Sequence, residues 1–293
     1  VRSVIHFTRN YANPGQMSKL NADIRAAAGG SVLVTVDHEG GRVQRFRGEG
    51  FPDQPSGREL GEAGVEAARA AGLAAAHDLR RVGFTMNLAP VLDGDSNPAN
   101  PVIGARAFSS DPVHAAACAV AYAQGLRAGG VHACGKHFPG HGDTNVDSHL
   151  DLPRLPHAME RLESVELVPF RAAAQAGIEA IMTAHVLFEA LDPTVPATLS
   201  RTVVTGLLRE RLGFDGLVIT DDFEMQAIAD RFEPGEAAVR AVEAGCDLVL
   251  VCHTPARQRR VIQALAEAMR SGRLTRERVD TSRKRLAKIL DSR

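Results

Sequence analysis

The sequence predicts an α/β fold in which parallel strands and helices alternate around a single barrel-like domain spanning residues 1–293. Short β-branched runs alternate with longer Ala-, Leu- and Arg-rich runs along the whole chain, and the strand-like runs are apolar throughout. Apolar strands separated by helices indicate a parallel sheet that is covered on its faces. No Pro-, Gly- or Ser-rich linker divides the chain, which favours one domain.

Seven strand–helix units are expected, and glycine follows many of the predicted helices, as Gly129 and Gly177 do. The strands are predicted at Val1–Phe7, Ser31–Asp37, Phe84–Asp93, Val131–Phe138, Ala180–His185, Gly216–Asp222 and Asp247–Cys252. The helices are predicted at Ser18–Ala28, Gly57–Val82, Pro112–Ala128, Ser164–Ala176, Val203–Leu212, Phe223–Ala244, Pro255–Ser271 and Thr275–Leu290. A (β/α)8 TIM barrel needs one strand more, so we expect this chain to lack its first N-terminal strand. No GxGxxG follows any strand, which argues against an open doubly wound sheet.

Composition narrows the possible partners. The formal net charge of -1 gives no general attraction to nucleic acid, and no apolar run reaches the ~20 residues of a membrane span. We therefore expect no nucleic-acid or membrane partner, and we expect a monomer. The four cysteines lie in apolar surroundings without CxxC spacing, so we expect reduced, buried thiols in a cytoplasmic protein.

Polar residues follow five of the predicted strands at the point where each strand ends. They are Asp37, Asp93, the pair Lys136–His137, His185 and the pair Asp221–Asp222. Barrels of parallel strands place their active sites at the carboxyl ends of the strands. The sequence therefore predicts a functional site at this end of the sheet.

The segment 136–153, KHFPGHGDTNVDSHLDLP, is the densest group of titratable side chains in the chain. Gly140 and Gly142 flank His141, so the loop can turn sharply and can move over a substrate. If the segment is extended, Asp147 and His149 face the same side. Asp147 would then orient His149 as a proton donor and acceptor, although a solvent-exposed turn is the alternative.

Asp221 ends an apolar strand in VITDD, which would hold its carboxylate over the barrel mouth. A carboxylate there can act as a nucleophile at the anomeric carbon of a sugar. Asp222, one residue later, has the place of a helix cap.

A metal site is the alternative to this interpretation. The possible ligands are His137, His141, Asp143, Asp147 and His149. Their spacing matches no HExxH-type signature, and Lys136 beside them would repel a cation. We therefore predict no metal site.

Several motifs together resemble family 3 glycoside hydrolases, and within them the β-N-acetylglucosaminidase branch. They are the loop 136–153, DHEGGRVQRF (37–46), NLAPVLD (87–93), VIGARAF (102–108), IMTAHV (181–186) and VITDDFEM (218–225). The resemblance covers nearly the whole chain in order. It implies a retaining exo-β-N-acetylglucosaminidase that removes terminal N-acetylglucosamine from short β-linked glycans, such as the GlcNAc-anhydroMurNAc muropeptides of peptidoglycan recycling.

The resemblance also implies a role for each matching residue. Asp221 is the expected nucleophile, His149 the acid/base and Asp147 its partner. The terminal sugar is expected to contact Asp37, Arg45, Arg106, Lys136 and His137, and His185 and Met225 are expected to line its pocket. No metal or organic cofactor is implied.

Two other functions remain open from the sequence. A phosphorylase would form the same glycosyl intermediate and pass it to phosphate, and a neutral histidine would not repel that anion. A non-catalytic muropeptide-binding protein would keep the pocket without turnover.

Overall fold

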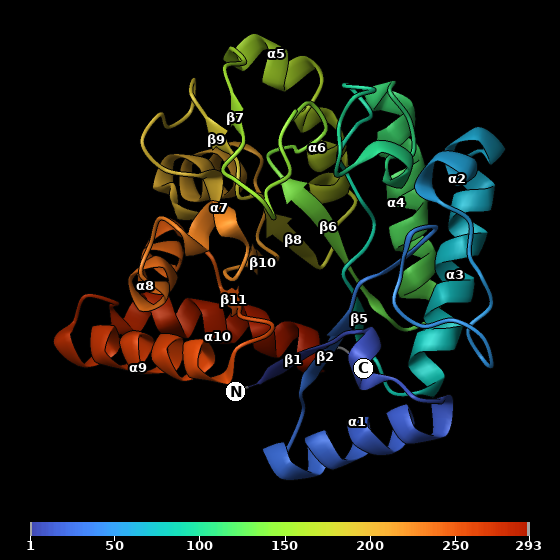
Figure 1. Ribbon diagram of the computed structural model, residues 1–293, viewed down its shortest axis with the longest axis horizontal. Helices are drawn as coiled ribbons and strands as arrows, with labels where there is room; N and C mark the ends of the chain where they lie inside the picture. The colour runs from blue at the N-terminus through green and yellow to red at the C-terminus, as the bar shows by residue number, and fades with distance from the viewer. Residues whose placement is uncertain (1, 292–293) are drawn as a thin grey trace.

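Seven parallel strands form a curled sheet in the computed structural model, which describes residues 2–291 (Figure 1). The strands follow one another across the sheet in chain order: β1 (Ser3–His6), β2 (Leu33–Val36), β5 (Met86–Asn87), β6 (His132–Phe138), β8 (Ala180–Thr183), β10 (Leu217–Asp222) and β11 (Leu248–Leu250). Every predicted strand is present, although most are shorter than predicted. Val1 of the first predicted strand lies outside the described residues.

The sheet is open between β1 and β11, because these two edge strands do not pair within residues 2–291. A cavity of about 310 Å³, lined by apolar side chains of both strands, runs along this seam. The parallel, chain-order topology is that of a (β/α)8 TIM-barrel-like domain, as predicted.

Two short strand pairs were not predicted. An antiparallel pair joins β3 (His38–Gly40) to β4 (Val43–Gln44), and a parallel pair joins β7 (Arg154–Leu155) to β9 (Leu187–Phe188). Strands of two or three residues are too short to show an apolar period in the sequence.

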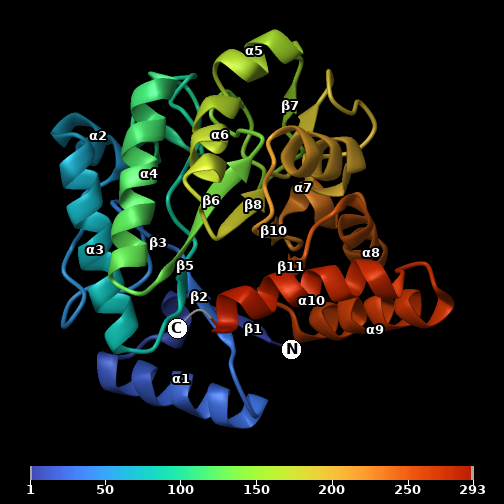
Figure 2. The ribbon, with the colours of Figure 1, turned by 180° about the vertical axis from the view of Figure 1, so that it is seen from behind.

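Helices cover the outside of the sheet (Figures 1 and 2). The α-helices are α1 (Pro14–Ala28), α2 (Gly57–Ala63), α3 (Val65–Arg81), α4 (Pro112–Ala128), α5 (Met159–Ser164), α6 (Leu167–Gln175), α7 (Gln226–Ala229), α8 (Pro234–Ala244), α9 (Pro255–Ser271) and α10 (Arg276–Asp291). Short 3₁₀ turns lie at Thr8–Asn10, Gly104–Arg106 and Ala197–Leu199, and the π-helical segment η4 spans Thr202–Arg211.

Two helices that the sequence predicts as continuous are interrupted. The predicted helix Gly57–Val82 breaks at Gly64, whose φ of 96° no helix allows. The predicted helix Phe223–Ala244 becomes α7 and α8, because Pro234 begins a new helix and the Glu233 carboxylate caps it by accepting from Glu236 N–H.

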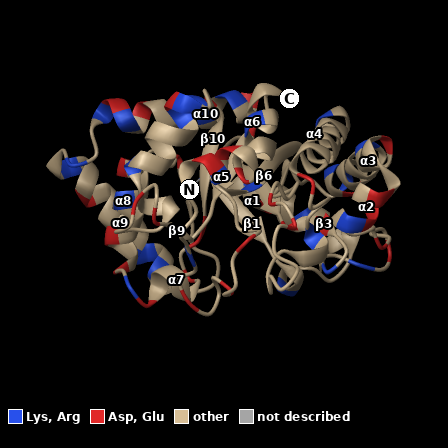
Figure 3. Cartoon of the chain, turned by 90° about the horizontal axis from the view of Figure 1, so that it is seen from above, with Lys and Arg blue, Asp and Glu red and all other residues tan. Residues whose placement is uncertain are grey.

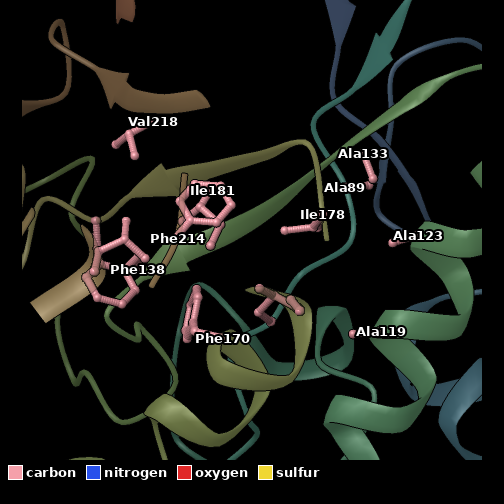
Figure 4. Packing of buried hydrophobic residues seen from close by; sticks show 14 of the residues in the cluster. Ala89, Ala119, Ala123, Ala133, Phe138, Phe170, Ile178, Ile181, Phe214 and Val218 are labelled. Atoms are coloured by element: carbon pink, nitrogen blue, oxygen red, sulfur yellow. The ribbon is translucent and has the colours of Figure 1, made fainter. Parts of the chain in front are cut away.

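Both faces of the central strands of the sheet are buried, which explains why these strands are largely apolar until their carboxyl ends. The inner face packs against Ile289 of α10 and contains Leu33, Met86, Cys134, Met182 and Ile219. The outer face packs against the helices, and Figure 4 shows Phe138, Phe170, Ile181 and Val218 in that layer.

The outer helix surfaces carry charges of both signs, interspersed rather than segregated (Figure 3). Within residues 2–291 no helix combines the length and the apolarity that crossing a membrane requires.

Candidate active site

The carboxyl ends of the strands surround a cavity of about 520 Å³. Every predicted site residue except His185 lines it: Asp37, Arg45, Arg106, Lys136, His137, Asp147, His149, Asp221 and Met225. The predicted residues come from the ends of β2, β5, β6 and β10 and from the loops that follow them, and they thus converge on one space. The carboxylate at the end of β10 and the imidazole of the Asp-Ser-His loop share this cavity.

A network of buried charges forms one wall of the cavity. Lys136 Nζ lies 2.5 Å from Asp37 Oδ1 and 2.7 Å from Glu39 Oε1. Arg106 donates two hydrogen bonds to the Glu39 carboxylate, from Nε to Oε2 at 2.9 Å and from Nη2 to Oε1 at 2.8 Å. Arg45 Nη2 lies 3.3 Å from the other oxygen of Asp37. Because each buried charge has an opposite partner, the wall presents fixed donors and acceptors to a ligand.

The charge network also sets its own protonation states. Burial would raise the pKa of Glu39, but Arg106 and Lys136 outweigh burial and hold this pKa well below its usual range. Burial would lower the pKa of Lys136, but Asp37 and Glu39 hold it above its usual value. These groups are therefore charged at neutral pH.

Glu39 was not among the predicted site residues. It lies two residues after Asp37, in the DHEGG motif, and the short strand β3 turns it toward the cavity. In a strand, residues two positions apart face the same side, so Glu39 could have been predicted to lie beside Asp37. The sequence does not show, however, that a short strand follows Asp37.

Asp93 organises the start of the loop that follows β6. Its Oδ2 accepts from His137 N–H at 3.0 Å and lies 2.6 Å from His137 Nδ1, and its Oδ1 accepts from His141 N–H at 2.6 Å. Burial opposes the charge on Asp93, yet the contacts with His137 and His141 lower its pKa overall. Asp93 therefore fixes the ring of His137 at the cavity.

The two glycines of this loop serve close packing. Gly140 has a φ of 142°, which favours glycine, as the sequence suggested. At Gly142 a Cβ atom would lie 1.9 Å from the carbonyl oxygen of Gly94. Gly142 therefore lets two backbone segments meet.

The neighbouring carboxylates Asp221 and Asp222 have opposite environments. Burial would raise the pKa of Asp221, but His137, His185 and the Asp222 N–H outweigh it and lower this pKa. Burial and the Asp221 charge raise the pKa of Asp222. Asp221 is thus the carboxylate held ionised at the cavity.

Asp222 is not the N-cap of α7, which is Met225. Its Oδ1 accepts from Glu224 N–H at 3.1 Å and from Cys252 N–H at 3.2 Å. It therefore ties the turn after β10 to the end of β11.

Asp147 and His149 come together through a turn rather than through strand alternation. Asp147 Oδ1 accepts from His149 N–H at 2.8 Å and lies 2.7 Å from His149 Nδ1, while Leu150 N–H donates to Asp147 O at 2.9 Å. The expected extended segment is therefore wrong, because the carboxylate caps a local turn. Burial would raise the pKa of Asp147, but its bonds to His149 lower this pKa.

His185 lies beneath the cavity and does not line it. The ring is fully buried, with Nδ1 2.9 Å from Thr198 Oγ1 and Nε2 3.1 Å from the Asp222 carbonyl oxygen. A direct contact of His185 with a ligand in this cavity is therefore not supported. The ring instead supports the backbone beside Asp221.

The possible metal ligands are divided among separate partners. His137 pairs with Asp93, His149 with Asp147, and Asp143 with His157 at 2.5 Å. Across residues 2–291 no three His, Cys, Asp or Glu side chains gather in an arrangement that could hold a metal ion.

An ionised carboxylate fixed at the end of a strand, and a histidine–aspartate pair that lines the same polar cavity, suit substitution at an acetal carbon. The class that this fold and site define is therefore a glycoside hydrolase. Comparison with known families agrees, because residues 1–289 match the glycosyl hydrolase family 3 N-terminal domain. The chain belongs to this family.

Relatives named for hexosaminidase activity match most of the chain. This chain is 43% identical over 277 residues to a β-hexosaminidase of Methylococcus capsulatus, and the match covers 93% of this chain and 82% of that protein. A family 3 β-N-acetylglucosaminidase from a Paenibacillus species superposes with a TM-score of 0.96 at 46% identity, over 99% of this chain and 56% of that one. A β-N-acetylhexosaminidase from Beutenbergia cavernae superposes with a TM-score of 0.92 at 32% identity, over 98% and 88%.

Proposed function

We propose that this protein is a retaining exo-β-N-acetylglucosaminidase acting on short β-linked glycans. The observation that carries the proposal is the shared cavity of Asp221 and His149, together with relatives named β-hexosaminidase. The finer proposal is that it removes N-acetylglucosamine from GlcNAc-anhydroMurNAc muropeptides during peptidoglycan recycling. The buried, unpaired cysteines suit a reducing compartment, and we propose a monomer in the cytoplasm.

The charged wall of the cavity supports recognition of the terminal sugar. Asp37 can accept from sugar hydroxyls, while Lys136 and Arg106 can donate to hydroxyl and acetamido oxygens. His137 and Arg45 complete this subsite in our proposal, and Met225 gives it an apolar side. The chain contains no Trp and two Tyr, and this scarcity of the aromatic residues that often line the clefts of long polysaccharides supports a short glycan as the substrate.

The first step forms a glycosyl–enzyme. An Asp221 oxygen attacks the anomeric carbon, and the bond from that carbon to the glycosidic oxygen breaks. His149 transfers a proton from Nε2 to the departing oxygen, so the aglycone leaves as a neutral alcohol. Nε2 takes this role because Nδ1 is engaged by Asp147 at 2.7 Å.

The second step releases the sugar. Nε2 of the now neutral His149 accepts a proton from a water molecule, whose oxygen attacks the anomeric carbon and displaces the Asp221 carboxylate. Two inversions restore the β configuration, and His149 and Asp221 regain their starting protonation states.

The test is to trap the intermediate with a fluorinated N-acetylglucosaminide that is hydrolysed slowly, and to locate the modified side chain by mass spectrometry. We expect the sugar on Asp221, and we expect Asp221→Ala to lose on the order of 10⁴-fold or more in kcat on an aryl β-N-acetylglucosaminide. Full turnover by Asp221→Ala would refute the nucleophile. If a sugar phosphate forms, and only when phosphate is added, the protein is a phosphorylase. If the glycan binds without turnover, the protein is a non-catalytic binding protein.

A further inference from the structure

Ser148, between the two members of the Asp147–His149 pair, is buried whereas its two neighbours are partly exposed. It is 1% exposed. The side chains of His149 and Asp147 are 63% and 29% exposed. A polar residue is buried in the middle of an exposed turn only where it has partners, because an unpaired hydroxyl would cost free energy.

The partners of Ser148 lie on both sides of the cavity. Its Oγ is 2.9 Å from His141 Nε2, in the loop after β6. Its carbonyl oxygen accepts from Ala227 N–H at 3.2 Å, in the segment after β10 that follows Asp221. The turn that carries His149 is thus attached to the strand-end loops of both β6 and β10.

His141 is itself firmly held. Its Nδ1 lies 2.7 Å from Thr144 Oγ1, its N–H donates to Asp93 Oδ1 at 2.6 Å, and its carbonyl oxygen accepts from Asn100 Nδ2 at 2.8 Å. Burial lowers the pKa of His141 to about 4, so the ring is neutral at neutral pH. A neutral imidazole donates through one nitrogen and accepts through the other, so both hydroxyls are satisfied in either tautomer.

We propose that Ser148 and His141 are positioning residues that anchor the Asp147–His149 pair in the orientation for proton transfer. Neither has to touch the reacting atoms, and the inference rests on the proposed acid/base role of His149. The turn has no regular secondary structure of its own, so its orientation relative to Asp221 depends on these bonds, together with the exposed ion pair between Asp151 and Arg231. Misplacing a catalytic group by about 1 Å can cost up to about 10²-fold in rate.

The readout that separates positioning from general stability is the dependence on the leaving group. A dinitrophenolate departs without protonation, whereas an unsubstituted phenol needs the proton of His149. The value of kcat/KM covers the steps through glycosylation alone. We expect Ser148→Ala to lose between about tenfold and 10²-fold in kcat/KM on the phenyl β-N-acetylglucosaminide. On the dinitrophenyl substrate we expect a loss of no more than about threefold, because Asp221 stays in place.

Two reference variants complete the experiment. Ser200→Ala removes the same hydroxyl from a serine that is also 1% exposed. Its Oγ donates to Asp192 Oδ2 at 2.8 Å and accepts from Val203 N–H at 3.3 Å, and both of these partners lie outside the loop 136–153. Ser200→Ala should lower Tm without changing the ratio of the two kcat/KM values. His149→Ala should show the same selectivity as Ser148→Ala, with a larger loss of about 10²–10⁴-fold.

The outcomes separate the two proposals. A selective loss in His149→Ala with an equal loss, or no loss, on both substrates in Ser148→Ala overturns the anchor and leaves the acid/base intact. The absence of selectivity in His149→Ala overturns the acid/base, and the anchor with it. His141→Asn keeps an amide near the position of Nδ1 for Thr144 but places no polar atom at the position of Nε2, so it removes the same bond from its other end. It should reproduce the selective loss, so the anchor is tested even where Ser148→Ala does not fold.

Discussion

At the scale of single residues, His38 is a buried side chain next to a cavity residue whose two polar atoms both lack a hydrogen-bond partner. It follows Asp37 directly, and its ring is fully buried between Phe46 and Phe51, with centroids 5.9 and 5.5 Å away. Neither ring nitrogen has a hydrogen-bond partner. Burial, with a smaller contribution from Arg47, lowers the pKa of His38 to about 4.

His38 therefore makes stability depend on pH. Between its ordinary pKa of 6.5 and its folded pKa of about 4, the unfolded chain binds a proton that the folded chain does not. The free energy of unfolding thus falls as pH falls through this window, by up to about 1.4 kcal/mol per pH unit from this residue. His38→Phe fits the aromatic surroundings and should reduce that slope, measured by denaturant unfolding at several pH values.

His141, whose pKa is also about 4, keeps its own contribution in the His38→Phe protein. The slope should therefore shrink without vanishing. His77→Gln changes an exposed histidine and serves as the control. An unchanged slope in His38→Phe would contradict this account.

At the scale of elements, the packing of α3 against α4 depends on glycine. A Cβ on Gly72 of α3 would lie 2.2 Å from the carbonyl oxygen of Tyr122, and one on Gly125 of α4 would lie 2.1 Å from that of Arg69. The two helices lie side by side on the outside of the sheet in both views (Figures 1 and 2). Glycine in mid-helix costs about 1 kcal/mol relative to alanine, and here the close approach of two backbones offsets that cost.

Gly72→Ala should destabilise the fold by about 1–3 kcal/mol, because the added methyl meets backbone that cannot turn away. A lower Tm in thermal unfolding, with KM almost unchanged, is the expected result. Gly15→Ala in α1 is the matched control, since its Cβ would meet Asn13 Oδ1 at an ordinary 3.4 Å. Equal Tm values for the two variants would show that the close contact is not important.

At the scale of the whole molecule, the two ends of the barrel have different roles. The cavity occupies the carboxyl ends of the strands, while Asp247, just before β11, joins the opposite end to α10. Its buried carboxylate accepts from Arg209 at 2.5 Å, from Arg278 at 3.3 Å and from Ser282 Oγ at 2.6 Å. Groups at the amino ends of barrel strands typically contribute stability rather than chemistry.

Asp247→Ala should lower the free energy of unfolding by about 3–5 kcal/mol, because it leaves buried guanidinium groups without a counter-charge. Arg285 pairs with both Asp247 and Asp215, at 3.4 and 3.0 Å. Asp215→Ala should nevertheless cost no more than about 1 kcal/mol, because the Asp215 side chain is exposed. Denaturant unfolding measures both, and KM should stay unchanged in both. A similar loss of unfolding free energy in the two variants would contradict the conclusion that the buried ion pairs of Asp247 stabilise the fold.

The sequence alone determined the order of the seven strands of the main sheet and of most of the helices between them. All seven strands were located, and Pro112–Ala128 and Pro255–Ser271 agree with α4 and α9 residue for residue. Apolar runs, prolines and capping residues act within a few residues of one another, so a sequence shows them directly. The polar residues at the strand ends were located for the same reason, because they border those runs.

Only the tertiary structure decided how the site residues act on one another. Glu39 between Arg106 and Lys136, Asp93 beneath His137, and Ser148 on His141 are contacts across loops from different strands. It also showed that His185, which the sequence predicted to line the cavity, does not line it but hydrogen-bonds to the backbone of Asp222. Distances between such residues depend on how the whole sheet curls and on which backbones approach closely, and no local pattern contains that information.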